Sequence, residues 1–285
     1  MARVVLIDPP LLKHPLWDPI RTSQPLGIWS IGSYLQARGH QARLVCAPLQ
    51  GIEQVSGPAQ GDGCGLSELL SRRVELLDRT SSDELVDRWF DDRTLLRVGL
   101  SDDEILAEID AFGPDVVAIA SLATCMHQSV VSLARTIRGR YPGLPIVVGG
   151  QHATAMPFEL LRDAAGAIDL IVAGEGEQVM GHIVDCLPDL AAARRLEGVA
   201  YLDEHDELVK NPRPPWANLA ELALLDPSLL EHVALPPLPV HTFGNCPKRY
   251  TDMMFSVGCH RACPYCYSPV MRGRLRQLSG DRIAA

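Results

Sequence analysis

Five short runs of consecutive apolar residues limit the folds open to this chain. Such runs are typical of strands that are buried on both faces of a parallel sheet. Helical patterns lie between them, at 28–35, 130–141 and 157–164. Strands that alternate with helices form a parallel sheet with right-handed crossovers. The sequence therefore predicts a flavodoxin-like α/β domain over residues 1–197, with five parallel strands at 3–7, 42–46, 115–120, 145–148 and 168–173.

The crossover between the second and third strands is long. It covers residues 47–114, whereas a whole βαβ unit takes about 30 residues. We expect a helical insertion on the domain edge; contact with a substrate or a partner is the alternative. The insertion is expected to begin with a glycine-rich loop, Gly57 to Gly65, and to continue with helices marked by Leu69, Leu70, Val74 and Leu77, by Leu85, Trp89 and Phe90, and by a capping box from Ser101 to Glu104.

A hairpin and a proline-rich stretch follow the sheet. The segments 198–202 and 207–210 flank a polar turn and form a plausible β-hairpin. Prolines recur from Pro212 to Pro247, which favours a semi-rigid linker. We therefore expect a hairpin and linker over 198–250 and the beginning of a second domain over 251–285.

Composition and charge exclude several classes of protein. No run approaches the roughly 18 apolar residues of a transmembrane helix, and the N-terminus has no signal-peptide pattern. The 35 acidic and 26 basic residues give a net charge of −9, with no basic cluster before about the last 15 residues. We expect a cytoplasmic protein that binds neither nucleic acid nor membrane.

Three of the eight cysteines lie close together near the C-terminus. Cys259, Cys263 and Cys266 have the spacing C-x3-C-x2-C, and three thiolates on one loop can hold a cubane iron–sulfur cluster with one open iron. A closed structural zinc site needs four ligands, and Cys246 or His260 could supply the fourth. Three cysteines without a metal are the remaining alternative.

This cysteine motif resembles the CxxxCxΦC signature of radical S-adenosylmethionine (SAM) enzymes, with Tyr265 as the aromatic residue. The likeness continues through 273–276. It implies that Cys259, Cys263 and Cys266 bind a [4Fe-4S] cluster and that SAM binds the open iron, with Tyr265 near the adenine. An external electron donor would then drive SAM cleavage to a 5′-deoxyadenosyl radical.

Four of the predicted strands end in residues suited to ligand binding. In an open parallel sheet, ligands bind beyond the carboxyl ends of the strands, and glycines there let a ligand approach the backbone closely. A plain turn is the alternative for each motif alone. The four segments are Asp8-Pro9-Pro10, Ser121 to Thr124, Gly149-Gly150-Gln151-His152 and Gly174-Glu175-Gly176-Glu177.

Together with the helix-opening Pro25-Leu26-Gly27, these segments resemble the N-terminal domain of cobalamin-dependent radical SAM enzymes. The likeness covers nearly the whole chain except the insertion. It implies that the nucleotide tail of cobalamin lies along Ser121 and Gly149-Gly150, and that the Glu175 loop meets the corrin rim. The cobalamin-binding residues it implies are Asp8, Pro9, Pro10, Ser121, Thr124, Gly149, Gly150, His152, Gly174, Glu175 and Gly176.

The chain departs from related families in two ways. Mutase-type domains carry Asp-x-His-x-x-Gly, whose histidine ligates cobalt, but Pro10 stands at that position here, so the resemblance implies base-off cobalamin. His14 is an alternative cobalt ligand. Few residues follow Cys266, whereas a (β/α) barrel takes about 200 or more. We therefore expect a fragment, a truncated product or a barrel on a separate polypeptide, inactive alone, with Val257 and Tyr265 exposed.

The resemblance implies a methyltransferase that acts on an unidentified small molecule, with cobalamin, a [4Fe-4S] cluster and SAM as cofactors. Ring contraction, cyclization and other rearrangements also occur in that family. The alternative from a different class is a non-catalytic cobalamin-binding carrier or partner subunit. A zinc-stabilised regulator is a third alternative.

Overall fold

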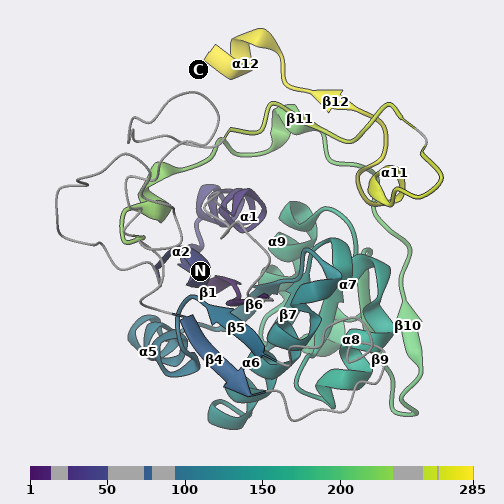
Figure 1. Cartoon of the computed structure of the whole chain (residues 1–285). Helices are drawn as coiled ribbons and strands as arrows, with labels where there is room; N and C mark the ends of the chain where they lie inside the picture. The colour runs from purple at the N-terminus through teal and green to yellow at the C-terminus, as the bar shows by residue number, and fades with distance from the viewer. Residues whose placement is uncertain (14–24, 51–73, 79–93, 234–252, 262, 285) are drawn as a thin grey trace, which may run out of the picture.

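A seven-stranded sheet runs through the centre of the protein (Figure 1). The computed structural model describes residues 1–13, 25–50, 74–78, 94–233, 253–261 and 263–284. The strand order is β10-β9-β8-β7-β6-β1-β3. Its strands are β1 (Arg3–Asp8), β3 (Gln41–Cys46), β6 (Val116–Ala120), β7 (Ile146–Gly149), β8 (Leu170–Val172), β9 (Val199–Leu202) and β10 (Leu208–Lys210).

Five adjacent strands, β3-β1-β6-β7-β8, are parallel, which confirms the predicted flavodoxin-like fold. The register aligns Ile7 with Ile119, Ala120 with Gly149, and Gly149 with Val172. The carboxyl ends of β1, β6, β7 and β8 therefore lie along one edge. The chain order reverses between β1 and β6, so this edge contains the switch point at which open α/β sheets bind ligands.

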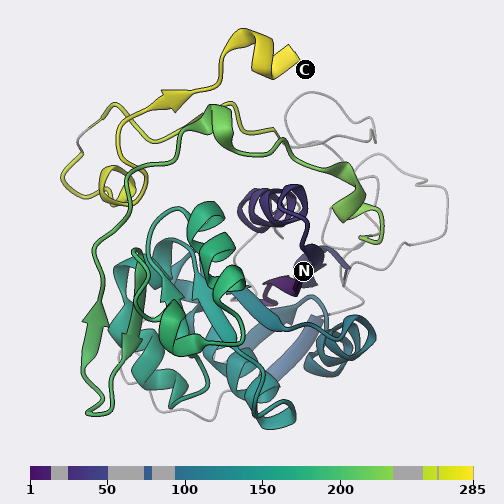
Figure 2. The same cartoon turned by 180° about the vertical axis from the view of Figure 1, so that it is seen from behind.

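Each strand divides its side chains between two helical layers, because successive side chains point to opposite faces. One face packs on α5 (Asp102–Phe112), α6 (His127–Arg140) and α8 (Pro157–Ala164). The other packs on α1 (Leu26–Ala37) and α9 (Gly176–Cys186). Both layers are visible in Figures 1 and 2. Burial on both faces explains why the strands are continuous apolar runs.

The predicted hairpin is present and extends this sheet. β9 pairs antiparallel with β8, and β10 pairs antiparallel with β9. The sheet thus continues past residue 197. In the linker that follows, η3 (Leu219–Glu221) and η4 (Pro227–Leu230) lie on the α1 side, where the Trp29 indole donates a 2.7 Å hydrogen bond to the Asp226 carbonyl. The linker prolines from Pro236 onward lie outside the described residues.

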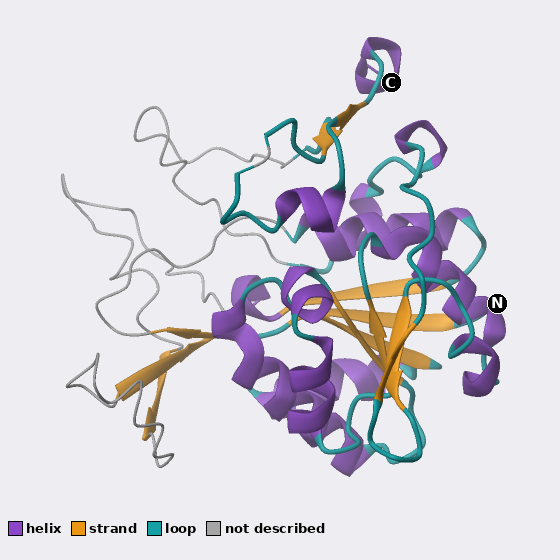
Figure 3. Cartoon of the chain, turned by 90° about the vertical axis from the view of Figure 1, so that its right-hand side faces the viewer, coloured by secondary structure: helices purple, strands orange, loops and turns teal. Residues whose placement is uncertain are grey.

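The helical prediction for the insertion is wrong where it covers residues 74–78. These residues form β4 (Val74–Asp78), which pairs with β5 (Thr94–Val98), and β5 pairs with β2 (Leu11–Lys13). This antiparallel sheet stands apart from the main one (Figure 3). A short apolar run with Val and Leu three residues apart fits either a helix or a strand, and pairing partners decide between them. Several features predicted from the sequence lie outside the described residues. These are the loop at 57–65, the remaining helical residues Leu69, Leu70, Leu85, Trp89 and Phe90, and the alternative cobalt ligand His14.

The third helix of the insertion is confirmed as α5. Ser101 and Glu104 form the reciprocal capping box, and Gly113 ends the helix with a φ of 61°. Four shorter helical elements lie in the described part of the domain. These are α2 (Ala47–Gln50), η2 (Thr124–Met126), α7 (Gln151–Ala155) and α10 (Leu190–Ala193).

The C-terminal segment crosses the α1 and α9 side of the molecule (Figures 1 and 2). β11 (Ser256–Val257) pairs antiparallel with β12 (Arg276–Gln277), and α11 (Ser268–Arg272) lies between them in sequence. The last helix, α12 (Gly280–Ala284), begins after Ser279, whose hydroxyl accepts a hydrogen bond from the Arg282 amide. No helix within the described residues is long and apolar enough to cross a membrane.

One glycine fixes the turn at the end of β7. Gly150 has a φ of +112°, and a Cβ there would lie 2.5 Å from the Ser121 carbonyl oxygen.

We predict that Gly150→Ala lowers the free energy of unfolding, measured by urea titration, by about 1–3 kcal/mol. Gly143→Ala is the control, because a Cβ at Gly143 meets nothing within 4 Å. Equal urea midpoints of unfolding for the two variants would contradict the role of Gly150 in fixing this turn.

Candidate functional site: a cavity at the carboxyl edge of the sheet

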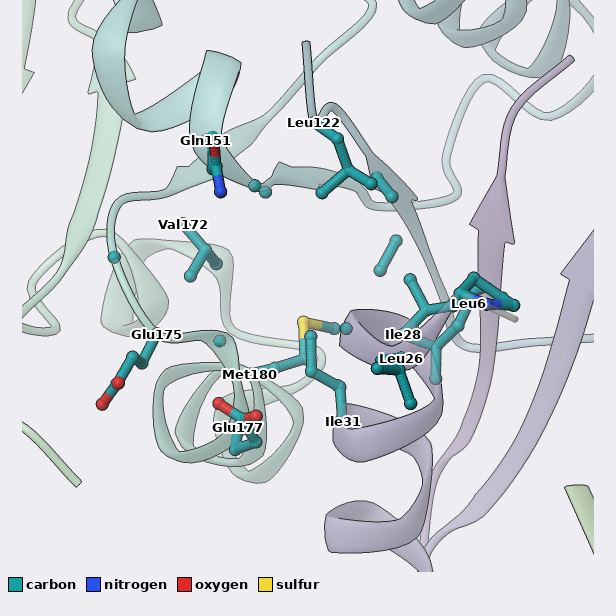
Figure 4. A pocket seen from close by; sticks show the side chains of 18 of the residues that line it. Leu6, Leu26, Ile28, Ile31, Leu122, Gln151, Val172, Glu175, Glu177 and Met180 are labelled. Atoms are coloured by element: carbon teal, nitrogen blue, oxygen red, sulfur yellow. The ribbon is translucent and has the colours of Figure 1, made fainter. Parts of the chain in front are cut away.

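A cavity of about 240 Å³ opens between the carboxyl edge of the sheet and helices α1 and α9 (Figure 4). Its floor consists of strand side chains that face these two helices. Ile28, Ile31 and Met180 contribute from the helices. The floor residues are Leu6, Ala118, Val147 and Val172, and they make the interior predominantly apolar.

Glycines shape both helices at this cavity. A Cβ at Gly27, in the first turn of α1, would meet nothing within 4 Å, so the glycine leaves space open at the wall. A Cβ at Gly176, in the first turn of α9, would lie 2.7 Å from the Cδ1 of Ile31. Gly176 therefore allows α1 and α9 to approach closely.

The C-terminal segment contributes to the same cavity. Met254, Val257, Met271 and Arg272 line it. Val257 is buried, so the expectation that it would be exposed is wrong, because it packs over the cavity. Tyr265 is 88% exposed, as expected, and does not line the cavity.

An ion pair joins this segment to the rim of the cavity. Both nitrogens at the end of the Arg276 guanidinium donate to the Glu175 carboxylate, one at 3.1 Å and the other closer. Arg276 also donates to the Ala217 carbonyl at 2.6 Å and lies over the ring of Trp216. The Ala217 amide donates to Glu175 at 3.0 Å. Glu175 is thus the point at which the sheet domain, the linker and the C-terminal segment meet.

Glu177 is a cavity residue that the predicted site did not include. Its side chain is 9% exposed, and Ser30 of α1 donates a 2.8 Å hydrogen bond to Oε1. Burial raises the pKa of Glu177, the nearby Glu175 charge acts in the same direction, and the hydrogen bond from Ser30 acts against it. The second glutamate of Gly-Glu-Gly-Glu was visible in the sequence. Its burial against Ser30 depends on the packing of α9 on α1, which the motif does not reveal.

Six of the predicted cobalamin-binding residues line the cavity. These are Asp8, Gly149, Gly150, Gly174, Glu175 and Gly176. Five others do not. Pro9 and Pro10 are buried beside it, Ser121 is buried behind Gly150, Thr124 is exposed on η2, and His152 is buried in α7.

His152 belongs to a separate polar chain. Its Nε2 lies 2.9 Å from Nδ1 of His127, whose Nε2 lies 3.0 Å from Asp163. Burial and the proximity of His127 lower the pKa of His152. The Nδ1 of His152 and the Oγ of Ser121 are buried without a hydrogen-bond partner in the described part of the protein.

Comparison with protein families decides what kind of domain this is. Residues 22–184 match the B12 binding domain, which is more than half of the chain. The chain belongs to the B12-binding domain family. The match contains α1, most of α9 and the ends of β6, β7 and β8 at the cavity, whereas β1 precedes it.

Individual relatives of this B12-binding protein include named methyltransferases. It is 27% identical over 65% of its length to an uncharacterized methyltransferase of Pyrococcus horikoshii, covering 39% of that protein. It is 25% identical over 75% of its length to the cytidylyl-2-hydroxyethylphosphonate methyltransferase of Streptomyces wedmorensis, covering 34%. The chain thus spans about a third of the length of these relatives.

Solved structures share the fold. The cobalamin-dependent SAM radical enzyme OxsB, with aqua-cobalamin and SAM bound, superposes on 99% of this chain with a TM-score of 0.65. TsrM from Kitasatospora setae, a radical SAM methyltransferase with cobalamin and a [4Fe-4S] cluster bound, superposes on 99% of this chain with a TM-score of 0.54. Both are 14% identical to it, and the matches cover 30% of OxsB and 44% of TsrM.

The three motif cysteines of this B12-binding protein lie on the loop between β11 and α11. Cys259 and Cys263 are half-buried, and Cys266 is exposed. Hydrogen bonds from Ser268 lower the pKa of the Cys266 thiol. Across the described ranges, no group of three or more His, Cys, Asp or Glu side chains is arranged to hold a metal ion. The cluster ligands therefore stay a prediction from the motif, and Cys246 lies outside the described residues.

The Glu175–Arg276 ion pair should hold the C-terminal segment over the cavity. Both side chains are about four-fifths buried, at 17% and 22% exposure. We predict that Arg276→Gln and Glu175→Gln each speed amide hydrogen exchange in 256–278. In a double-mutant cycle, the two changes should show a coupling free energy of about 1–2 kcal/mol for opening of this segment. Arg38→Gln is the control, because the Arg38–Asp185 pair is roughly 40% exposed and such pairs contribute about 1 kcal/mol or less. Independent effects of the two changes would contradict the prediction.

The raised pKa of Glu177 predicts a pH-dependent stability. A carboxyl with a higher pKa in the folded state stabilises the protein at low pH, and this contribution is lost as pH rises from the ordinary value, 4.5, through the raised one. We predict that the melting temperature of Glu177→Gln rises relative to that of the native protein across this window. Melting curves between pH 4 and 8 measure it, with the exposed Glu204→Gln as control. A constant difference across that range would show that Glu177 is not responsible.

Proposed function

We propose that this chain is the cofactor-binding part of a cobalamin-dependent radical SAM enzyme, and that the enzyme transfers a methyl group to a small molecule. One observation carries the proposal. The apolar cavity at the carboxyl edge of a B12-binding domain is lined in part by the segment that bears the C-x3-C-x2-C motif.

The residues of the cavity suit the nucleotide tail of cobalamin. An apolar cavity of about 150 Å³ holds benzene, so one of about 240 Å³ can accept a bicyclic aromatic base. Gly149, Gly150 and Gly174 at the rim would let the corrin approach the backbone.

The cobalt would have no histidine below it from this cavity. None of the described residues that line it is a histidine. Pro10, which stands where mutase-type domains carry the ligating histidine, supports this part of the proposal. His14 lies outside the described residues, so its role as a ligand stays a prediction.

Cys259, Cys263 and Cys266 would hold the [4Fe-4S] cluster, with Tyr265 beside SAM. Bound cobalamin supplies a transferable methyl group, and the cluster with SAM supplies radical chemistry. The part of this chain is to place them. Met254 and Met271, which flank the cysteine loop in sequence, both line the cavity, so the loop is attached close to its mouth. Glu175 and Arg276 fix that attachment.

Support for methyl transfer comes from the two relatives described above, since both are named methyltransferases. Cyclases are also among the relatives, such as the anaerobic magnesium-protoporphyrin IX monomethyl ester cyclase of Rubrivivax gelatinosus, at 27% identity over 59% of this chain. The reaction requires an external electron donor. Residues of a barrel, on this or a separate polypeptide, would complete the SAM and substrate sites. Reduced thiols and an iron–sulfur cluster fit a cytoplasmic location.

A non-catalytic cobalamin-binding module is the second candidate. It is supported by the family match, which covers the B12-binding domain and ends before the cysteine motif. The two candidates differ in whether the cysteines take up a cluster. Anaerobic reconstitution with iron and sulfide should give a [4Fe-4S] Mössbauer spectrum in the native protein and none after replacement of all three cysteines by alanine. Cobalamin uptake without a cluster would support the module, and stoichiometric zinc without a corrinoid would support a regulator.

A cavity-filling substitution tests the cobalamin site itself. Ala118 lies on the floor of the cavity, so Ala118→Leu should weaken hydroxocobalamin binding by about tenfold or more, the loss expected when a ligand group no longer fits. Absorbance of the desalted complex measures binding. The control is Ala111→Leu on the exposed side of α5, which adds the same atoms away from the cavity. Equal affinities of the two variants would rule the cavity out as the tail site.

A further inference from the structure

The least expected group in this cavity is the Glu177 carboxyl. We infer that Glu177 reads the base of the cofactor's nucleotide tail, by donating a hydrogen bond from its carboxyl to a ring nitrogen of that base. The inference rests on the proposed cobalamin site. It adds to that proposal a preference among cobamides, the corrinoids that differ in this base.

The position of Glu177 suits this role. It lies in the first turn of α9, is nine-tenths buried and lines the cavity. In Figure 4 it lies near Met180 and Ile31, on the side of the cavity opposite Gln151, while Glu175 points away. Among the described lining residues, Asp8, Gln151, Glu175, Glu177 and Arg272 are the ones with polar or charged side chains. Glu175 is occupied by Arg276, and Arg272 belongs to the segment over the mouth.

The hydrogen bond from Ser30 determines where the proton of Glu177 lies. The Ser30 hydroxyl donates to Oε1, so a neutral carboxyl carries its proton on Oε2. Burial is the largest influence and favours the neutral form, since it raises the pKa of Glu177. The hydrogen bonds from Ser30 and from a backbone amide oppose it, as does the charge of Arg272, while the charge of Glu175 adds to the effect of burial. Oε2–H is then a donor in a largely apolar space. Such a donor is stabilised by an acceptor and costs free energy when left unpaired.

A benzimidazole or purine base meets this requirement. In a base-off corrinoid the ring nitrogen that would ligate cobalt is free, and once buried it needs a hydrogen-bond donor. The flat faces of the base would pack on Leu6, Val172 and Met180. A phenolic base has no ring nitrogen, so it would leave Oε2–H unpaired.

The experiment compares two ligands on three proteins. Cobalamin, with its benzimidazole, and a cobamide with a p-cresol base are titrated into the native protein, Glu177→Gln and Glu177→Met, and Kd is measured by absorbance. The native protein should prefer cobalamin by about 3- to 10-fold more than Glu177→Met does, the effect of one buried neutral hydrogen bond. Glu177→Gln should keep the preference, because its amide accepts from Ser30 and donates to the base.

Two serines of α1 provide a matched control. Ser30→Ala removes the contact that orients Glu177 and should reduce the preference for cobalamin. Ser33→Ala removes a buried hydroxyl one turn away, which donates to the Trp29 carbonyl, and should leave the preference unchanged. Thermal unfolding verifies that each variant folds, and Glu177→Leu replaces Glu177→Met if the latter does not.

The outcomes separate this inference from the proposed function. If both corrinoids bind and Glu177→Met keeps the native preference, Glu177 is only a structural contact between α1 and α9, and the inference fails while the cobalamin site stands. If neither corrinoid binds the native protein, the proposed function fails and the inference fails with it.

Discussion

The site depends on the close packing of α1 and α9 over one face of a parallel sheet. Gly176 removes the side chain that would collide with Ile31, and Gly181 does the same opposite Tyr34. The Ser30–Glu177 hydrogen bond joins the two helices within this contact. The helices cover the ends of β1, β6, β7 and β8 from one side, and the space left between them is the cavity. If the helices were further apart, the apolar floor would be open to solvent.

The C-terminal segment completes the enclosure. Met254, Val257 and Met271 add apolar surface above the strand ends, and Arg276 binds Glu175 at the rim. The segment that carries the cysteine motif is therefore held on the cavity by Glu175, the glutamate that the family resemblance implies at a corrin rim. In the proposed function, this arrangement would bring a cluster and a corrinoid together on one protein.

Much of the fold could be predicted from the sequence because its strands are buried on both faces. A run such as Val4 to Ile7 fits few structures besides a fully buried strand, and the Ser101 capping box and Gly113 mark both ends of α5. β4 could not be predicted, since Val74 and Leu77 fit a helix as well as a strand and its partner β5 gives no local signal. The glycine-rich strand ends predicted the position of the site. Glu177, Arg276 and Val257 were missed because their roles arise from contacts between segments far apart in the sequence.

The central claim is that the cavity takes the nucleotide tail of cobalamin and offers the cobalt no histidine. Electron paramagnetic resonance of cob(II)alamin bound to the native protein tests it most directly, because a nitrogen ligand below the cobalt splits the cobalt lines into triplets. The account predicts a bound, base-off spectrum without nitrogen splitting. A spectrum with triplet splitting, or one identical to that of free cob(II)alamin, would contradict it.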